Sequence, residues 1–332
     1  LVFWLGLVVF QAVVRWGQDG RRVLLGWLAF SAAGVILALL ALFGAILPNK
    51  LPILGDLAGR VPQLMAGWPG AEAGFQPNQV AGTLLWFLPA PAAVLFCRHG
   101  LARLTDSLIR WFSAVLLVAQ IILLITFLLM QSRGAMIGAA VATLTLLLTK
   151  RRGRLVFLLI LLLAIIGLSL VGGETVKTFL NVQFLQDATG PFEPDFRLKL
   201  WAAAWQATGD FAYTGMGLGL FRHFGPLLYP FPTRPADVGH AHNFFLHTGA
   251  EMGVLGLVAL SGLWLATMMV LVRGLKEEGQ WRPLLLAAGW SFIAFTIYGL
   301  TDAVALGSKP SVFLWFFLGL VVITQSRRSG GL

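Results

Sequence analysis

A short polar turn, Gln131-Ser132-Arg133-Gly134, separates two strongly hydrophobic runs that are joined by almost no loop. A guanidinium at that position is costly to bury in an apolar environment, so Arg133 is expected to face a polar cavity, a partner or a lipid headgroup. Because guanidinium groups form paired hydrogen bonds with phosphate oxygens, the functional interpretation is an anion clamp. The alternative is an anchor that reaches out to lipid phosphate.

A second polar cluster, Gly239-His240-Ala241-His242-Asn243, opens a long hydrophobic run. An imidazole titrates near neutral pH, so His242 is the candidate general base for a hydroxyl nucleophile. At 100° per residue His242 shares one narrow helical face with small residues, which would let a neighbouring helix approach closely. Those residues are Gly249, Gly253 and Gly256. The alternative is that His242 caps or packs the start of the helix beside Asn243.

Two further pairings involve the same run. His247 and Glu251 are four residues apart and are expected to pair, whereas Glu251 lies about 180° from His242, which argues against a direct pair between those two. His240-x-His242 with His247 matches no known zinc-helix spacing and has no thiolate beside it, so no metal site is predicted. His240 and His99 are expected to be solvated loop residues.

A glycine-rich stretch, Gly215-Met216-Gly217-Leu218-Gly219, precedes Phe221 and Arg222. No predicted strand comes before it, so it is not a dinucleotide fingerprint. Two interpretations stay open: an extended loop around Gly217 whose backbone N–H groups approach a phosphate, or a plain turn. Near the C-terminus, Asp302 and Lys309 flank a short loop, where they are expected either to lock the structure by pairing or to form part of a site.

The elements that must position these residues are hydrophobic along the whole chain. Of 332 residues, 58% are hydrophobic and 11% are charged, and the mean hydropathy is +0.83, which excludes a soluble globular domain. A helix needs about 20 apolar residues to cross a bilayer. We therefore predict an all-α fold, a polytopic transmembrane helix bundle with about nine crossings. The predicted crossings are residues 1 to 14, 23 to 47, 79 to 97, 108 to 130, 134 to 149, 155 to 172, 243 to 272, 283 to 301 and 309 to 325.

The net charge of +10 is explained by topology rather than by binding to nucleic acid. Alternate loops divide the charges into a set of 15 basic and 4 acidic residues and a set of 9 basic and 10 acidic residues, as the positive-inside rule expects. The basic run at 150 to 154 is thereby placed inside, and residues 173 to 242 outside. The first run is short for a crossing, so we expect earlier helices before it. Cys97 is the only cysteine, which excludes an intrachain disulfide.

The topology divides the chain into N-terminal helices over residues 1–172, an outer loop over 173–242 and C-terminal helices over 243–332. Within the outer loop, Glu193-Pro194-Asp195 is a helix-start signal. The following side chains recur at helical spacing, which predicts a short amphipathic helix at the membrane interface. They are Leu198, Trp201, Trp205 and Thr208.

The order of these polar motifs resembles that of the O-antigen ligase and polymerase family of membrane glycosyltransferases. The matching pieces are Pro77-Asn78, Ser132-Arg133-Gly134, Arg197 with Trp201, Gly215-x-Gly217-x-Gly219-x-Phe221, His242-Asn243 followed after nine residues by Gly253-x-x-Gly256, and Asp302. The His-Asn-x9-Gly-x-x-Gly spacing is the most specific of them. The resemblance covers about residues 75–325.

The resemblance implies transfer of a glycan from an undecaprenyl-diphosphate carrier to an acceptor on the periplasmic or outer face of the bacterial plasma membrane, with neither metal nor cofactor. The residues suit this chemistry. Arg133 and Arg197, with Arg222, would neutralise the leaving diphosphate, and His242 would act on the acceptor hydroxyl. The supporting residues are expected to be Asn243, Glu251, Asp302, Lys309 and Gly217.

Several functional alternatives stay open. Ligases, polymerases and protein-glycosylating members of the family share these motifs, so the acceptor is a lipid A-core, a glycan or a protein. A membrane transporter would show repeats and polar groups near the midplane, whereas polarity here concentrates at the outer face. A structural scaffold would leave the motif spacing unexplained.

Overall fold

The computed structural model describes residues 1–50, 52–65, 68, 74–97, 106–148, 194–229, 239–276 and 279–329. These residues form helices and no strand, apart from one isolated bridge between Ala45 and Phe75, so the all-α prediction is confirmed for this part of the chain. The predicted crossing at 155–172 and the basic run at 150–154 lie outside the described residues.

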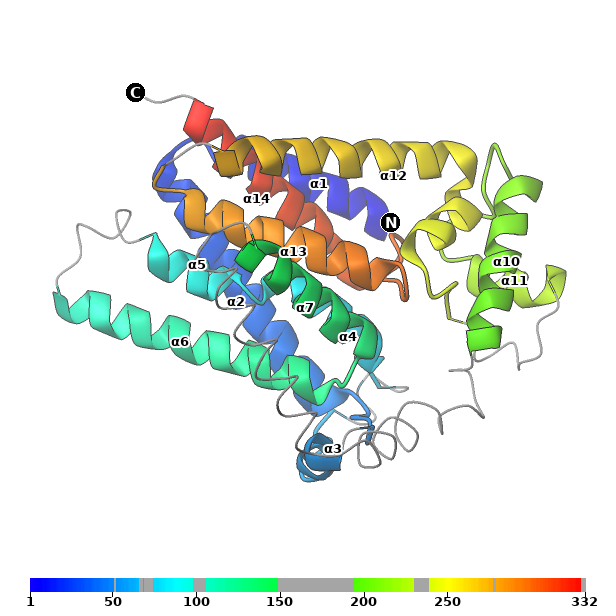
Figure 1. Cartoon of the computed structure of the whole chain (residues 1–332), viewed down its shortest axis with the longest axis horizontal. Helices are drawn as coiled ribbons and strands as arrows, with labels where there is room; N and C mark the ends of the chain where they lie inside the picture. The colour runs from blue at the N-terminus through cyan, green and yellow to red at the C-terminus, as the bar shows by residue number, and fades with distance from the viewer. Residues whose placement is uncertain are drawn as a thin grey trace.

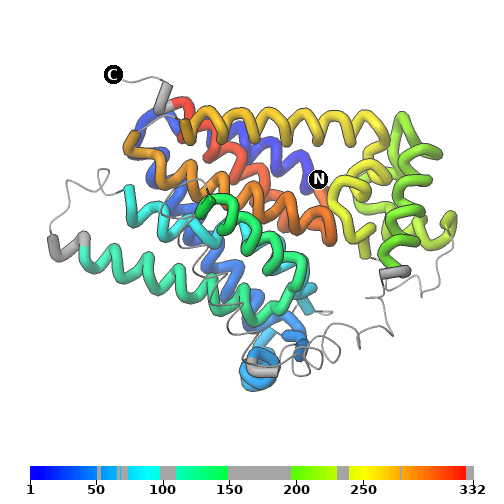
Figure 2. The backbone as a smooth tube through the Cα atoms, in the orientation of Figure 1, coloured from blue at the N-terminus to red at the C-terminus, as the bar shows by residue number. Residues whose placement is uncertain are grey.

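Figure 2 traces the backbone from the N-terminus to the C-terminus. The N-terminal half contains α1 (Val2–Trp16), α2 (Gly20–Gly44), α3 (Pro52–Gly59), α4 (Pro77–Phe87), α5 (Ala90–Phe96), α6 (Asp106–Leu129) and α7 (Arg133–Leu148). The C-terminal half contains α10 (Pro194–Asp210), α11 (Phe221–Leu228), α12 (Phe244–Lys276), α13 (Arg282–Gly299), the short 3-10 helix η4 (Lys309–Ser311) and α14 (Val312–Ser329).

Among the residues that the structure describes, five helical segments are long and apolar enough to cross a membrane. They are α2, the α4–α5 segment Pro77–Phe96, residues Arg110–Leu129 of α6, α12, and Lys309–Ser326. The apolar helices α1 and α7 are shorter. The chain is thus a multi-pass membrane protein, while the full set of nine crossings stays a prediction.

The membrane helices pack into one bundle with a shared apolar core. In Figure 1, α1 runs beside α14, and α7 lies against α13. Trp86 stacks on Phe295 with ring centroids 4.2 Å apart, and the indole of Trp27 donates a hydrogen bond of 2.9 Å to Thr324. Gly138 on α7 lies so close to α13 that any added Cβ would overlap the carbonyl oxygen of Ala294. A small residue is what lets two membrane helices approach this closely.

The crossing predicted as a single helix at 79–97 is interrupted between α4 and α5. Pro89 and Pro91 cannot donate backbone hydrogen bonds, so the helix breaks there and leaves polar backbone groups inside the bundle. Gln120 of α6 supplies the missing partners, because its amide donates to the carbonyl of Leu88 (2.8 Å) and accepts from the N–H of Ala92 (3.3 Å). A side chain of the neighbouring helix thereby satisfies the backbone groups at the break, as a membrane interior requires.

The helices α10 and α11 stand at one end of the bundle, against the first turns of α12 (Figure 1). We call α10, α11 and these first turns the end module. It has a small apolar core of its own, in which Phe196 and Leu200 of α10 are buried with Phe221 of α11. The phenol of Tyr229 donates a 2.7 Å hydrogen bond to Asp210, which ties the two helices together.

The predicted short helix at 194–208 is confirmed as α10, but its four spaced side chains do not share one environment. Leu198 and Trp205 are exposed. Trp201 instead donates its indole N–H to the carbonyl of His242 at 3.2 Å, and Thr208 is buried where α10 meets Gly249 of α12. The stripe that the sequence predicts for the membrane interface is therefore divided between exposed and buried positions.

Candidate functional site

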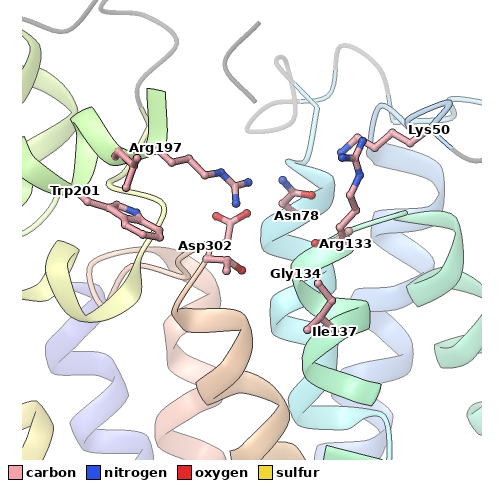
Figure 3. Close-up of a pocket in the computed structure, with 11 residues that line it drawn as sticks. Lys50, Asn78, Arg133, Gly134, Ile137, Arg197, Trp201 and Asp302 are labelled. Atoms are coloured by element: carbon pink, nitrogen blue, oxygen red, sulfur yellow. The ribbon is translucent and has the colours of Figure 1, made fainter. Parts of the chain in front are cut away.

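A cavity of about 380 Å³ opens where the end module meets the bundle. Figure 3 shows the side chains that line it, which come from five parts of the chain. They are Lys50, Asn78, Ser132, Arg133, Gly134, Ile137, Arg197, Leu198, Trp201, Thr301 and Asp302. Three of these residues are cationic and one is anionic, so the cavity carries a net positive charge suited to an anion.

The turn before α7 places Arg133 at the rim of this cavity. Gln131 adopts a left-handed backbone conformation (φ 47°) that reverses the chain, and its side chain accepts a 2.8 Å hydrogen bond from the backbone N–H of Lys50. A Cβ at Gly134 would lie 2.6 Å from the hydroxyl oxygen of Thr301, so glycine permits the start of α7 to approach the end of α13. The result is that Arg133 and Lys50 lie side by side (Figure 3).

The first turn of α10 brings Arg197 to the opposite wall. Figure 3 shows its guanidinium extending across the cavity toward Asn78 and Asp302. The Nε atom of Arg197 is buried and has no hydrogen-bond partner in the described part of the chain. A buried donor without a partner is costly, so an anion that entered the cavity would gain a ready partner there. Arg133 and Arg197 thus line one cavity, although 64 residues separate them.

Two cations that the sequence groups with this site lie elsewhere. Arg222 is exposed on α11 and is not among the residues that line the cavity. Lys309 is exposed at the start of η4, and the expected pair between Lys309 and Asp302 is wrong because Asp302 turns inward to two imidazoles instead. Periodicity could not predict this, since both residues lie in loops.

Asp302 joins two histidines from the loop before α12. Its Oδ1 lies 3.3 Å from Nδ1 of His242 and 3.5 Å from Nε2 of His240. The contact with His242 is an ion-pair distance without the alignment of a full hydrogen bond. The side chain of Asp302 is 4% exposed and that of His242 is 18% exposed, so the imidazole retains access to solvent.

His242 precedes α12 rather than belonging to it. The helix begins at Phe244, and His242 has a left-handed backbone conformation (φ 48°) that is uncommon for a residue with a side chain. Its predicted place at the top of a glycine face is therefore wrong. Asn243 is the cap, because its side-chain oxygen accepts from the N–H groups of Phe245 and Leu246 at 3.0 Å each. Its amide also donates to the carbonyl of Leu300 at 3.1 Å.

His240 is buried, which corrects the expectation that it is a solvated loop residue. Burial lowers the pKa of His240 to about 4, although the Asp302 carboxylate acts in the opposite direction. Burial would raise the pKa of Asp302, but the imidazoles of His242 and His240 and the N–H of Ala303 outweigh it, and the net pKa lies below its ordinary value. The carboxyl is therefore ionised and His240 is neutral at pH 7.

The ligand-type atoms of His240, His242 and Asp302 lie within 4.8 Å of one another, a grouping of the kind that binds metal ions. The hydrogen bonds argue against this use. Nδ1 of His240 accepts from the backbone N–H of His242 at 3.2 Å, which assigns the proton to Nε2, the nitrogen that faces Asp302. A protonated nitrogen cannot ligate a metal. The two imidazoles lie at ion-pair distance from the carboxylate, and the tautomer of His240 directs a protonated nitrogen toward it.

The glycine-rich stretch packs against an interruption of α12 and does not form a phosphate loop around the cavity. Gly253 has φ 68° and ψ −170°, which breaks the helix. The backbone N–H groups of Met216 and Gly217 donate to the carbonyls of Ala250 and Glu251 at 2.9 Å each. Of the two interpretations left open by the sequence, the turn fits, because the N–H of Leu220 donates to the carbonyl of Gly217 at 3.1 Å. The stretch also satisfies the backbone of a broken helix.

The predicted pair of His247 and Glu251 is confirmed. Their side-chain atoms Nε2 and Oε2 lie 3.5 Å apart, with exposed fractions of 3% and 2%. No ion pair or hydrogen bond joins Glu251 to His242 in the described structure, although the helical-wheel argument does not apply to His242, which lies before the helix. The sequence therefore identified both carboxylates that belong to this end of the molecule, but matched only one of them with its histidine.

Sequence reasoning missed three residues of the site. Lys50 and Asn78 line the cavity, and His240 bridges to Asp302. Asn78 had a signal in the Pro77-Asn78 motif, and Lys50 follows a hydrophobic run on the same side of the bundle as Arg133. The burial of His240 had none, because it depends on a loop more than 60 residues away in sequence.

Comparison with known proteins gives one match. A family model described as O-antigen ligase matches residues 92–261, which is half of the chain. The matched region contains Arg133, Arg197 and His242 and ends before Asp302. A comparison with curated proteins returned no match.

Proposed function

The chain belongs to the O-antigen ligase family, and from this premise we propose that it is a membrane glycosyltransferase with the cavity as its active site. It would transfer a glycan from an undecaprenyl-diphosphate carrier to an acceptor hydroxyl on the outer face of the bacterial plasma membrane. One observation carries the proposal: Arg133 and Arg197 line a single cavity with the carboxylate of Asp302, which is itself joined to His242.

The donor diphosphate would lie between the two arginines. Arg133 and Arg197 reach the cavity from α7 and α10, so they can contact both phosphates from opposite sides. Guanidinium groups bind phosphate oxygens through paired hydrogen bonds, and fixed cations stabilise the charge that develops as the carrier diphosphate leaves. Lys50 adds a third cation beside Arg133.

The acceptor would be activated by His242. Nδ1 of His242 faces Asp302 at 3.3 Å, and in the reacting complex this nitrogen would carry the ring proton and donate a hydrogen bond to the carboxylate, which leaves Nε2 as the basic nitrogen. As the acceptor oxygen attacks the anomeric carbon, the bond from that carbon to the phosphate oxygen breaks, the acceptor proton passes to Nε2, and the carrier diphosphate departs with the electron pair. Asp302 holds the imidazole in orientation and stabilises the imidazolium that forms.

This arrangement accounts for the reaction with residues of the chain alone. The three cations supply the neutralisation that a divalent ion provides in many phosphate sites. We therefore propose a metal-independent reaction without a cofactor. Arg222 and Lys309 have no part in it, while Asn243 contributes by fixing the start of α12 next to His242.

A polysaccharide polymerase and a protein O-oligosaccharyltransferase use the same donor chemistry, and the acceptor separates them from a ligase. The purified chain in proteoliposomes should transfer glycan from an undecaprenyl-diphosphate donor, and parallel reactions with lipid A-core, a second glycan and a protein acceptor identify the class. Absence of transfer to all three, with donor uptake instead, would favour a transporter.

The outer location of the site is tested separately by cysteine labelling. In a Cys97→Ser background, a cysteine at 210 should react with an impermeant reagent in intact cells, because the charges of the loops predict that residues 173–242 lie outside. A cysteine at 152 should not react. The reverse pattern would overturn the proposed orientation.

A further inference from the structure

The break in α12 joins two segments that are distant in sequence. Besides the contacts of the glycine-rich stretch, the N–H of Val254 donates to the carbonyl of Ala212 at 2.8 Å. Gly253 lies so close to this segment that an added Cβ would overlap the carbonyl oxygen of Ala212. The backbone groups freed by the break therefore have partners, and the first turns of α12 are fixed to the loop between α10 and α11.

Glu251 is the side chain that completes this attachment. Its Oε1 accepts from the backbone N–H of Gly219 at 2.9 Å and from that of Phe221 at 3.4 Å. Its Oε2 is left for His247. One buried carboxylate therefore contacts both the loop before α11 and an imidazole one turn earlier in its own helix.

His247, which contacts Glu251, also contacts the loop that carries His242. Its Nδ1 accepts from the backbone N–H of Ala241 at 3.5 Å, which assigns the ring proton to Nε2, the nitrogen directed at Glu251. The Phe221 ring packs edge-on against the imidazole, with centroids 5.6 Å apart. Glu251 thus selects the tautomer of His247 that can accept from Ala241.

Ala241 lies between the two histidines that contact Asp302. The next residue, His242, has the left-handed conformation described above. This conformation costs free energy, so it persists only where the surrounding structure imposes it. Its N–H is held by Nδ1 of His240, and the N–H before it by Nδ1 of His247. The conformation of the loop is fixed by two imidazole acceptors on consecutive amides.

We propose that Glu251 and His247 are positioning residues, which hold the 240–242 loop so that the His242 imidazole faces Asp302 and the acceptor. The inference rests on the proposed function, in which His242 receives the acceptor proton. It adds a role for two buried groups that touch neither the cavity nor the substrates. Groups that do not touch the substrate but form hydrogen bonds around a functional histidine commonly fix its tautomer and orientation.

The sharpest test is Glu251→Gln. The amide oxygen can still accept from Gly219 and Phe221, but its NH2 group offers a proton to Nε2 of His247, so the ring proton moves to Nδ1 and opposes the N–H of Ala241. Because a small displacement of a reacting group is costly, we expect kcat to fall at least about tenfold. The donor KM should stay within about twofold, since Arg133 and Arg197 lie on other helices.

Rescue distinguishes positioning from folding. In His247→Asn, the amide oxygen takes the place of Nδ1 and accepts from Ala241 whatever occupies residue 251. The double variant of Glu251→Gln with His247→Asn should therefore recover most of the lost kcat. His247→Gln places its amide near Nε2 instead and should not support turnover. If Glu251→Gln fails to fold, the comparison of His247→Asn with His247→Gln still decides the question.

Hydrogen exchange of the peptide 239–246 provides a readout that does not depend on activity. Exchange at Ala241 and His242 should rise in Glu251→Gln and return in the double variant. Asp19→Asn is the matched control, because asparagine caps α2 as well as aspartate does and the residue lies far from the site in sequence.

Three results would overturn the inference: wild-type kcat and exchange in Glu251→Gln, equal turnover of the two His247 variants, or kcat and KM that change together with melting temperature. If the wild-type chain transfers no glycan, the proposed function fails, and the exchange experiment still decides whether Glu251 holds the loop.

Discussion

The His242–Asp302 pair, of which Asp302 lines the cavity, joins two loops that are separated by the length of α12 and α13. The His247–Glu251 pair, beside the break in α12, lies instead within one turn of a single helix. We refer to them as the cavity pair and the break pair. The His242 side chain is 18% exposed, while both members of the break pair are almost completely buried. The same two chemical groups are therefore suited to different tasks.

Access to solvent decides which pair can act on a substrate. An imidazole that exchanges protons must reach the reacting group. In the cavity pair, Asp302 lines the cavity and the imidazole beside it is partly exposed. The break pair is enclosed by backbone N–H groups and the Phe221 ring, so its charge and hydrogen bonds can only fix neighbouring structure. A histidine beside a carboxylate is thus not by itself evidence of catalysis.

The largest expected effect comes from removing the imidazole of the cavity pair. His242→Ala should reduce turnover at least about a hundredfold, because a general base typically contributes 10² to 10⁴ in rate. Donor binding and expression should be nearly unchanged. Steady-state kinetics with melting temperatures as the control measure both. His240→Ala should reduce turnover much less but cost stability, since His240 is buried against Asp302. Equal and mild effects of the two substitutions would remove His242 from the catalytic role.

A smaller effect is expected from the cations that face the cavity pair. Arg133→Lys and Arg197→Lys keep the charge but lose the planar group that binds phosphate in pairs, so kcat/KM should fall by about ten- to hundredfold while insertion is normal. Arg15→Lys, at the exposed end of α1, is the matched control. If both cavity variants retained turnover and donor affinity, the arginines would instead be anchors for lipid headgroups.

The smallest effect is the contribution of His240, beside the cavity pair, to the pH dependence of stability. The folded-state pKa of His240 is about 4, below its ordinary value of 6.5, so the unfolded chain binds more protons between these values. The stability that the folded protein has because His240 is neutral is complete above about pH 7. It is lost as the pH falls toward 4. From pH 8 to 5 we expect a loss of about 2 kcal/mol that His240→Asn abolishes. Thermal unfolding of both proteins across this range measures it, and identical slopes would contradict the assignment.

The break pair shows how far local sequence could lead. His247 and Glu251 are four residues apart, and helical geometry alone brings such residues together, so their contact was predictable. Helical spacing led to a wrong prediction for His242, because α12 begins two residues later at Phe244. Helical spacing does not apply to His242, a left-handed residue before the cap. The interruption at Gly253 was equally invisible, since a glycine in a hydrophobic run also suits close packing of helices.

The sequence by itself determined the class of the protein and most of its helices. Long apolar runs must form helices in a membrane, where backbone groups have no water to bind, and the spacing of a few polar motifs was specific enough to indicate the family. It also indicated Arg133, Arg197, His242 and Asp302 as candidate site residues. Which of these residues meet was decided only by the tertiary structure. Arg133, Arg197 and Asp302 reach one cavity from three elements, and contacts between residues so far apart depend on how helices pack rather than on any period in the chain.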